Sequence, residues 1–138
     1  MTNIRTAEKG AVIGQLTTAP IIRHTLALYC GASGDHNPIH VDIDFARAAG
    51  MPDVFAHGML SMAYLGRLLT DLVPQTTLRS FSTRFTSITQ LGAAITCTAK
   101  LLERFKEGGE DRARLELSAV DQNNDVKLLG EAVVAYSS

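Results

Sequence analysis

The sequence predicts an α+β domain in which one long central helix is wrapped by a curved antiparallel sheet. Two observations lead to this prediction. The second half of the chain alternates apolar and polar residues as half-buried strands do, and Gly58–Val73 is apolar on almost every face. A helix of that composition belongs inside a protein, and a sheet can cover it. No repeat or Pro/Ser-rich linker divides the 138 residues, so we expect one domain over 1–138.

Four runs in the second half show the two-residue period of strands. They cover Arg79–Ser87, Ile95–Leu101, Ala113–Ala119 and Val126–Tyr136, and a further strand is expected over Val12–Leu16. The polar segments Glu107–Glu110 and Gln122–Asp125 have the composition of short hairpin connections. We therefore expect the four runs to form an antiparallel meander.

The first half of the chain lacks this alternation. Ile22–Ala32 is predicted to be a short helix that is stopped by Gly31 and Gly34. Asp35–Pro52 is expected to be irregular, because it contains two prolines and a glycine.

Composition gives no sign of nucleic-acid binding and argues against a membrane span. The net charge is −1, with 13 Lys and Arg against 14 Asp and Glu, and no basic stripe is present. Phe55–Val73 is apolar but contains His57, Arg67 and Asp71, so a buried helix explains it better than a membrane span. Residues 1–14 show no apolar signal segment.

The cysteines indicate a reducing compartment. Cys30 and Cys97 are far apart and lack CxxC spacing, so we expect two small buried thiols rather than a disulfide framework. These features together predict a cytoplasmic protein with neither a nucleic-acid nor a membrane partner.

Asp35 and His40 are the candidate proton-transfer residues. A carboxylate and an imidazole exchange protons readily near neutral pH, and five residues apart in a proline-constrained loop they can converge on one water molecule. Asn37 and Pro38 are expected to fix the turn between them. The spacing alone is equally compatible with a solvated loop that has no catalytic role.

A metal site is the less favoured interpretation of the same segment. His36 and His40 have the four-residue spacing of zinc ligands on a helix. Pro38 lies between them and would break that helix, so we predict no bound metal.

Gly58 is the candidate electrophilic element. If the apolar helix begins there, its first N–H groups are unpaired and face outward at the positive end of the helix dipole. Glycine lets a carbonyl oxygen approach that backbone closely, as an oxyanion site requires. Close packing at a helix start would explain a glycine here as well, and His57 is expected to cap or pack rather than react.

These residues resemble the signature of the MaoC-like dehydratases, also called (R)-specific enoyl-CoA hydratases. The resemblance is carried by Tyr29, Ser33-Gly34-Asp35-x-Asn37-Pro38-Ile39-His40 and Ala46, and then by Gly50-Met51-Pro52 and Ala56-His57-Gly58-Met59. It is dense over Tyr29–Leu60 and rests on pattern alone in the strands that follow. Ala32 and Ile22 depart from the family's usual residues at positions outside the chemistry.

The resemblance implies a hot-dog fold, usually a homodimer whose sheets join edge to edge, and a lyase of fatty acid metabolism that needs no cofactor. Asp35 and His40 would hydrate a trans-2-enoyl thioester reversibly to the (R)-3-hydroxyacyl thioester, with the Gly58 N–H on the thioester oxygen. The substrate would be an acyl-CoA or an acyl-ACP. Its predicted contacts are Asn37, His57, Met59, Met62 and Leu65.

Two other functions remain open at this level. A hot-dog thioesterase would use the same oxyanion donor, but the only acidic residue on the long helix is Asp71, at its far end. A non-catalytic subunit of a heterodimeric hydratase would tend to lose the acid or the base, and this chain has both. Arg84, Lys100 and Arg104 are the cations expected near the pocket mouth.

Overall fold

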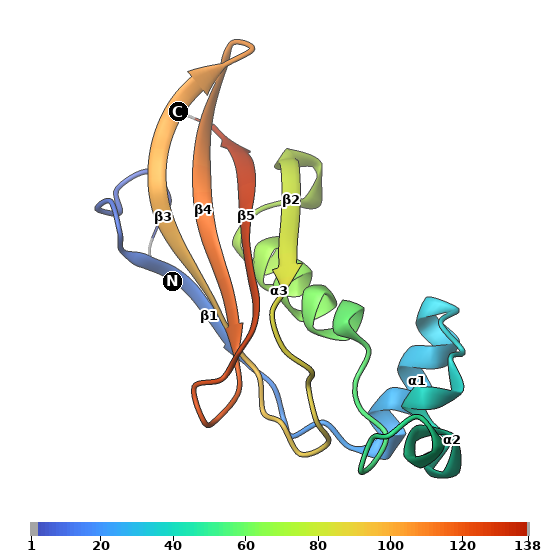
Figure 1. The fold of residues 1–138 in the computed structure, drawn as a ribbon. Helices are drawn as coiled ribbons and strands as arrows, with labels where there is room; N and C mark the ends of the chain where they lie inside the picture. The colour runs from blue at the N-terminus through green and yellow to red at the C-terminus, as the bar shows by residue number, and fades with distance from the viewer. Residues whose placement is uncertain (1–2, 138) are drawn as a thin grey trace.

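The computed structural model describes residues 3–137 and confirms the α+β architecture. The strands are β1 (Val12–Thr17), β2 (Leu78–Phe85), β3 (Thr96–Glu107), β4 (Glu110–Val120) and β5 (Val126–Tyr136), and the helices are α1 (Arg23–Ser33), α2 (Ile43–Ala48) and α3 (Gly58–Leu72). Two 3-10 helices, η1 (Pro38–His40) and η2 (Gln75–Thr77), complete the described elements. The strands form one curved antiparallel sheet in the order β1-β3-β4-β5-β2 (Figure 1).

The long helix α3 packs against one face of this sheet and contacts β1, β3, β4 and β5. Its buried face consists of Leu60, Ser61, Leu65, Leu68 and Leu69. The opposite face is open in this chain: Met59 is 51% exposed, and Ala63 is exposed beside it. The predicted central helix is confirmed, and its outer face is exposed in the single chain because the sheet covers only one side of it.

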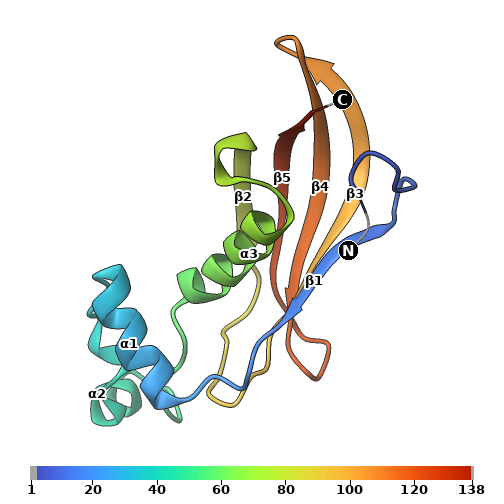
Figure 2. The ribbon, with the colours of Figure 1, turned by 180° about the vertical axis from the view of Figure 1, so that it is seen from behind.

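The helices α1 and α2 lie together off the sheet, beyond the start of α3 (Figures 1 and 2). Residues 35–52 were expected to be irregular, but they contain η1 and α2. Asp42 caps α2 by accepting hydrogen bonds from the N–H groups of Asp44 and Phe45, at 3.0 and 3.2 Å. Gly50, with φ 86°, ends the helical turn. Asp42 and Gly50 are thus the start and stop signals of a helix too short for its periodicity to show.

The predicted helix over Ile22–Ala32 is confirmed with a shift of one residue. Of the two glycines expected to end this helix, only the second does so. Gly31 lies inside α1, whereas Gly34 adopts φ 75° and donates its N–H to Cys30 O at 3.0 Å.

Strand order corrects the predicted four-strand meander. β3, β4 and β5 do follow one another through the two expected hairpins, but β2 pairs with β5 at the far edge, and β1 occupies the place beside β3. Alternation reports which face of a strand is buried, not which strand lies next to it. Residues 86–95 carry the chain from one side of the sheet to the other.

Two further sequence predictions concern thiols and membranes. Cys30 and Cys97 are both free and buried, as expected. Burial raises the pKa of the Cys97 thiol to about 12. Within the described residues, no helix has the length and apolar character needed to cross a membrane.

A glycine contact between β2 and β5 generates a stability prediction. A Cβ on Gly130 would lie 2.3 Å from Ser82 O and 2.9 Å from Thr83 Cγ2, so Gly130→Ala must push β2 away from the sheet. We expect a loss of about 1–3 kcal/mol in the free energy of unfolding, the cost of overpacking, measured by urea denaturation. Gly31→Ala is the matched control: its Cβ meets no heavy atom within 4 Å, and it should stabilise α1 by about 0.5–1 kcal/mol. Equal effects of the two substitutions would contradict this account.

Candidate active site

The C-terminal end of α1 positions Asp35. The left-handed Gly34 turns the chain back on itself, and Ser33 then holds the turn from both sides. Its hydroxyl donates to Tyr29 O at 2.6 Å and accepts from the Asp35 N–H at 3.1 Å. The Asp35 backbone is therefore tied to the last turn of the helix.

The 3-10 helix η1 positions His40. Asn37 Oδ1 accepts from the Ile39 N–H at 3.1 Å, and Pro38 supplies the first residue of the helix. The Asn37 N–H donates to Asp35 Oδ1 at 3.2 Å. The predicted role of Asn37 and Pro38 in fixing this turn is confirmed, and the same turn joins the carboxylate to the imidazole.

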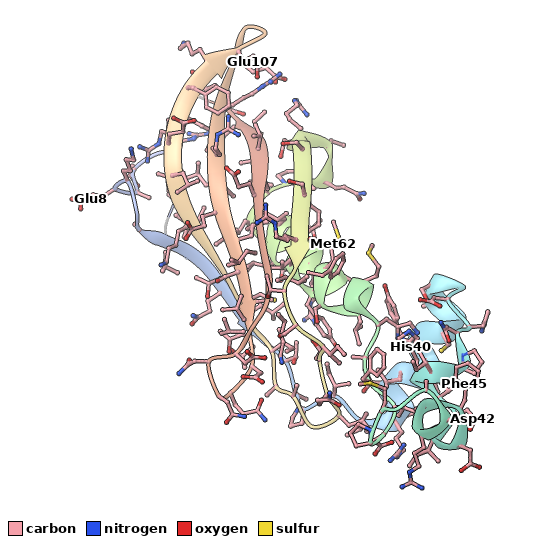
Figure 3. All side chains as sticks on the ribbon, in the orientation of Figure 1. Glu8, His40, Asp42, Phe45, Met62 and Glu107 are labelled. Atoms are coloured by element: carbon pink, nitrogen blue, oxygen red, sulfur yellow. The ribbon has the colours of Figure 1, made fainter. Side chains whose placement is uncertain are left out.

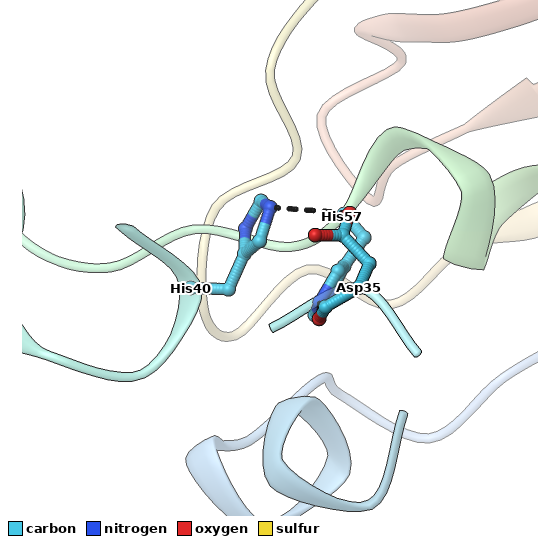
Figure 4. A group of neighbouring side chains, drawn as sticks. All are labelled: Asp35, His40 and His57. Atoms are coloured by element: carbon cyan, nitrogen blue, oxygen red, sulfur yellow. Dashed lines mark hydrogen bonds and ion pairs between the residues drawn. The ribbon is translucent and has the colours of Figure 1, made fainter. Parts of the chain in front are cut away.

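The imidazole of His40 has one nitrogen anchored and one free. Its Nδ1 donates to Phe55 O at 2.7 Å, which leaves the lone pair of the neutral ring on Nε2. Nε2 lies 3.9 Å from Asp35 Oδ2 (Figure 4). That separation is too long for a direct hydrogen bond, so a third polar group can contact both atoms. The Asp35 side chain is 49% exposed and the His40 side chain 10%, so the pair is open to solvent from the carboxylate side.

His57 completes a cluster that the sequence did not predict. Its ring stacks on His40, with 3.8 Å between centroids and 25° between planes. Burial lowers the pKa of His57, and the charge of His40 acts in the same direction; the hydrogen bond to Asp35 and the charge of Asp35 oppose them. His57 is therefore held neutral beside Asp35 and His40.

Asp35, His40 and His57 are also the group in the described part of the chain whose donor atoms lie close enough for a metal ion, within 4.8 Å of one another. An imidazole binds a metal through the lone pair of a ring nitrogen, and His57 Nε2 is already committed to Asp35 O at 3.2 Å. His40 Nδ1 is already committed to Phe55 O. His36 is exposed and lies outside the group. The geometry fits acid–base chemistry better than metal binding.

Gly58 is the first residue of α3, as predicted. Within residues 3–137 its N–H has no hydrogen-bond acceptor, as expected at a helix start without a side-chain cap. A Cβ on Gly58 would lie 2.9 Å from two ring carbons of Phe85, so the glycine is also required by close packing. Both sequence interpretations of Gly58 are thus compatible with the structure.

Beside Gly58 lies a depression of about 340 Å³. It is lined by Phe55, Ala56, Gly58, Phe85, Thr86, Ser87, Ile88 and Thr89. Its outer wall is held by the buried Lys127, whose Nζ donates to Ile88 O at 2.9 Å and pairs with Asp125 at 2.5 Å. Phe85 and Ile88 are 52% and 44% exposed, so this wall presents apolar surface next to the free N–H.

The remaining predicted substrate contacts lie at different depths. Met59 is half exposed, and Met62 lies on α3 beside β2, where its sulfur accepts from Thr83 Oγ1 at 3.4 Å (Figure 3). Leu65 is fully buried in the core. Asn37 is exposed with its side-chain oxygen engaged in the turn.

Of the cations expected at the pocket mouth, Arg104 is misassigned. Its guanidinium donates to Ile4 O at 2.8 Å and to Ala7 O at 2.5 Å, so it anchors the N-terminal segment instead. Lys100 lies opposite Glu116 in the register of β3 and β4, and Arg84 lies next to Phe85 at the end of β2.

Sequence reasoning did not predict which groups orient the pair, although it named His57 as a residue expected to cap, to pack or to contact substrate. The Phe55 carbonyl is a backbone atom and has no sequence signal. His57 precedes the predicted helix start, so its position at a helix N-cap was the one available indication. The helices α1 and α2 together project from the sheet (Figures 1 and 2), and we call them the α1–α2 projection. Figure 3 shows His40 where this projection meets the start of α3.

Comparison with known proteins identifies the family. Residues 6–124 match the family model described as the MaoC like domain. The chain belongs to this family. It is 34% identical over 113 residues to a fatty acid synthase subunit beta from Aspergillus oryzae, covering 78% of this chain and 5% of that protein. It is 37% identical over 62 residues to 3-hydroxyacyl-thioester dehydratase Z from Mycobacterium tuberculosis, covering 45% of this chain and 41% of the dehydratase. The chain thus spans less than half the length of these relatives.

Solved structures of two (R)-hydratases share the fold. R-hydratase PhaJ1 from Pseudomonas aeruginosa, in its unliganded form, superposes with a TM-score of 0.84 at 26% identity, covering 99% of this chain and 86% of that one. The (R)-hydratase from A. caviae gives a TM-score of 0.82 at 23% identity, covering 96% and 99%. The hot-dog fold implied by the sequence resemblance is confirmed.

The lowered pKa of His57 predicts how stability depends on pH. An unfolded histidine titrates near about 6.5, so as pH falls the unfolded chain binds a proton at His57 before the folded chain does. This contribution to stability is complete above about pH 6.5 and is lost as pH falls toward the folded-state pKa. We expect the urea midpoint of the wild type to drop between about pH 7.5 and 5.5, with a smaller drop in His57→Gln. His24 is exposed, so His24→Gln should show the same drop in urea midpoint as the wild type. An equally large drop in His57→Gln would contradict the assignment of this pH dependence to His57.

Proposed function

We propose that the chain hydrates trans-2-enoyl thioesters reversibly to (R)-3-hydroxyacyl thioesters. The observation that carries the proposal is the geometry of His40, whose Nδ1 is anchored on Phe55 O and whose Nε2 lies 3.9 Å from Asp35 Oδ2. A water molecule between these atoms can be both oriented and deprotonated. The names of the P. aeruginosa R-hydratase and the mycobacterial dehydratase describe the two directions of such a reaction and support the proposal.

In the proposed reaction, the Asp35/His40 pair transfers protons and the start of α3 polarises the thioester. The thioester oxygen accepts the Gly58 N–H, which withdraws electron density from the β-carbon. Water oxygen bonds to that carbon as the π bond breaks, one water proton passes to the Asp35/His40 pair, and the pair delivers a proton to the α-carbon. Because the two groups are adjacent, they act as one coupled acid–base unit. The reaction is redox-neutral and uses no cofactor.

The apolar depression beside Gly58 is the proposed place of the thioester and the first acyl carbons. Met59 and Met62 lie on the neighbouring face of α3, where an acyl chain can follow the helix. Leu65 contributes to the core beneath this face. The acyl carrier is CoA or acyl carrier protein.

The described residues favour neither alternative function. A thioesterase would need a carboxylate on α3 that faces the thioester, but Asp71 is exposed in the last turn, about 20 Å along the helix from Gly58. A non-catalytic subunit has no need of an anchored His40 beside Asp35. Release of free thiol from a saturated acyl-CoA would identify a thioesterase. A purified chain without activity would identify a non-catalytic subunit.

We propose that the chain forms a homodimer through the β2 edge. β2 ends the sheet, so one side of its backbone is unpaired, and Ser80–Thr83 has neither the charge nor the proline that protects isolated edges. Met59, Phe85 and Ile88 expose apolar surface nearby. We expect a dimer in size-exclusion chromatography with light scattering; a stable monomer at working concentration would contradict it.

Removal of either member of the pair tests the reaction. We expect Asp35→Asn and His40→Ala each to lower kcat for crotonyl-CoA hydration by about 10²-fold or more, the contribution of positioned acid–base groups. The loss of enoyl-thioester absorbance measures the rate, and chiral chromatography of the product reports the (R) configuration. His36→Ala is the matched control, since this exposed neighbour lies outside the cluster. Near-normal turnover in both test variants would exclude the mechanism.

The N–H of Gly58 can be tested apart from its small size. Phe85→Ala first makes room for a Cβ, and Gly58→Pro and Gly58→Ala are then compared in that background. Both carry a Cβ, but only proline lacks the N–H. Proline is favoured at the first helical position, and His57, with φ −56° and ψ 133°, already has the conformation that precedes proline.

We expect the proline variant to have a kcat about 10²- to 10³-fold below that of the alanine variant, the loss measured when an oxyanion donor is removed. Circular dichroism checks that α3 is intact in both. Equal kcat values would show that the N–H takes no part.

A further inference from the structure

We propose that His57 is a positioning residue that holds Asp35 and His40 in their mutual arrangement. The proposal rests on the hydration function proposed above and deepens it. His57 is 1% exposed, so it lies beneath the pair rather than in contact with bulk solvent or substrate. This assigns a role different from the substrate contact expected from the sequence.

One ring of His57 contacts both members of the pair by different means. Its face stacks on the His40 ring, at 3.8 Å between centroids. Its Nε2 lies 3.2 Å from the backbone oxygen of Asp35. A carbonyl oxygen only accepts, so Nε2 carries the proton and donates it. Movement of His57 would therefore displace the Asp35 backbone and the His40 ring together.

The rest of the environment fixes the ring in place. Tyr29 meets it edge-on, with 4.8 Å between centroids, and Cys30 Sγ lies 3.5 Å from Nε2. The backbone of His57 is the N-cap of α3 and is continuous with Gly58. The ring thus links the end of α1, the η1 histidine and the start of the long helix.

The chemistry of the ring argues against a purely packing role. His57 Nδ1 is buried and has no hydrogen-bond partner within residues 3–137. A phenyl ring would fill the same space without an unsatisfied nitrogen. The imidazole is explained by its two other properties, the N–H directed at Asp35 and an uncharged face beneath His40.

The charge state of the cluster follows from these contacts. The titratable groups facing His57 are His40, Asp35, Tyr29 and Cys30. Burial keeps the pKa of His57 low, so a proton taken up during the reaction remains on His40 or Asp35. A neutral ring face can lie against a protonated His40, whereas a second charged imidazole would repel it.

Two substitutions separate the contacts. His57→Phe retains the stacking ring and removes the N–H, and His57→Gln retains a donor and removes the ring. We expect each to lower kcat for crotonyl-CoA between about 10- and 10²-fold with little change in KM, because small misplacements of reacting groups have effects of this size. The pH profile of kcat should also shift in His57→Gln, because this substitution removes the ring that stacks on His40. His24→Gln, exposed on α1, is the matched control.

A raised KM with unchanged kcat would show that His57 binds substrate and would overturn the proposal. An unchanged kcat together with an unchanged pH profile in folded His57→Phe and His57→Gln would also overturn the proposal. Inactive wild-type protein would instead defeat the hydration function itself.

Imidazole ¹⁵N spectra of the wild-type chain give a reading that needs neither activity nor a folded variant. We expect His57 to be the neutral Nε2–H tautomer at neutral pH. An Nδ1–H tautomer or a charged His57 at neutral pH would overturn the proposal.

Discussion

The packing of α3 against the curved sheet is the contact on which the site depends. Leu65, Leu68 and Leu69 are almost fully buried under the strands, and each contributes about 1.5–3 kcal/mol by leaving water. A helix is stiff along its axis, so once these leucines are seated the position of its first residue is determined as well. The free N–H of Gly58 and the ring of His57 are thereby fixed relative to the sheet.

Backbone atoms do most of the orienting around this helix start. Phe55 O sets the tautomer of His40, and Asp35 O receives the N–H of His57. The contributing segments come from the end of α1, from η1 and from the residues before α3, and they meet where the α1–α2 projection joins the rest of the molecule (Figure 1). Short irregular segments held by a rigid scaffold are a usual way to build a precise site. The small helix α2, capped by Asp42, is the last element of this projection.

The site is asymmetric in its exposure. The carboxylate of Asp35 is half exposed, His40 is nearly buried and His57 is buried completely. A water molecule can therefore approach from the carboxylate side, while the imidazoles lie where their hydrogen bonds are protected from solvent. Within residues 3–137 the Nδ1 of His57 has no hydrogen-bond partner, and burying it in this way is a cost to stability beside Asp35 and His40.

Much of this protein is determined by its sequence alone. Val126–Tyr136 was predicted with the bounds that β5 has, and α3 was predicted to within one residue, because periodicity and helix starts are local properties. The convergence of Asp35 and His40 was predicted by the same local means, since one proline-constrained turn joins them. The tertiary structure alone decided that β2 pairs with β5 and that His57 lies under His40. These arrangements depend on contacts between segments far apart in the chain, whose residues carry no mark of the partner they will meet once the core has formed.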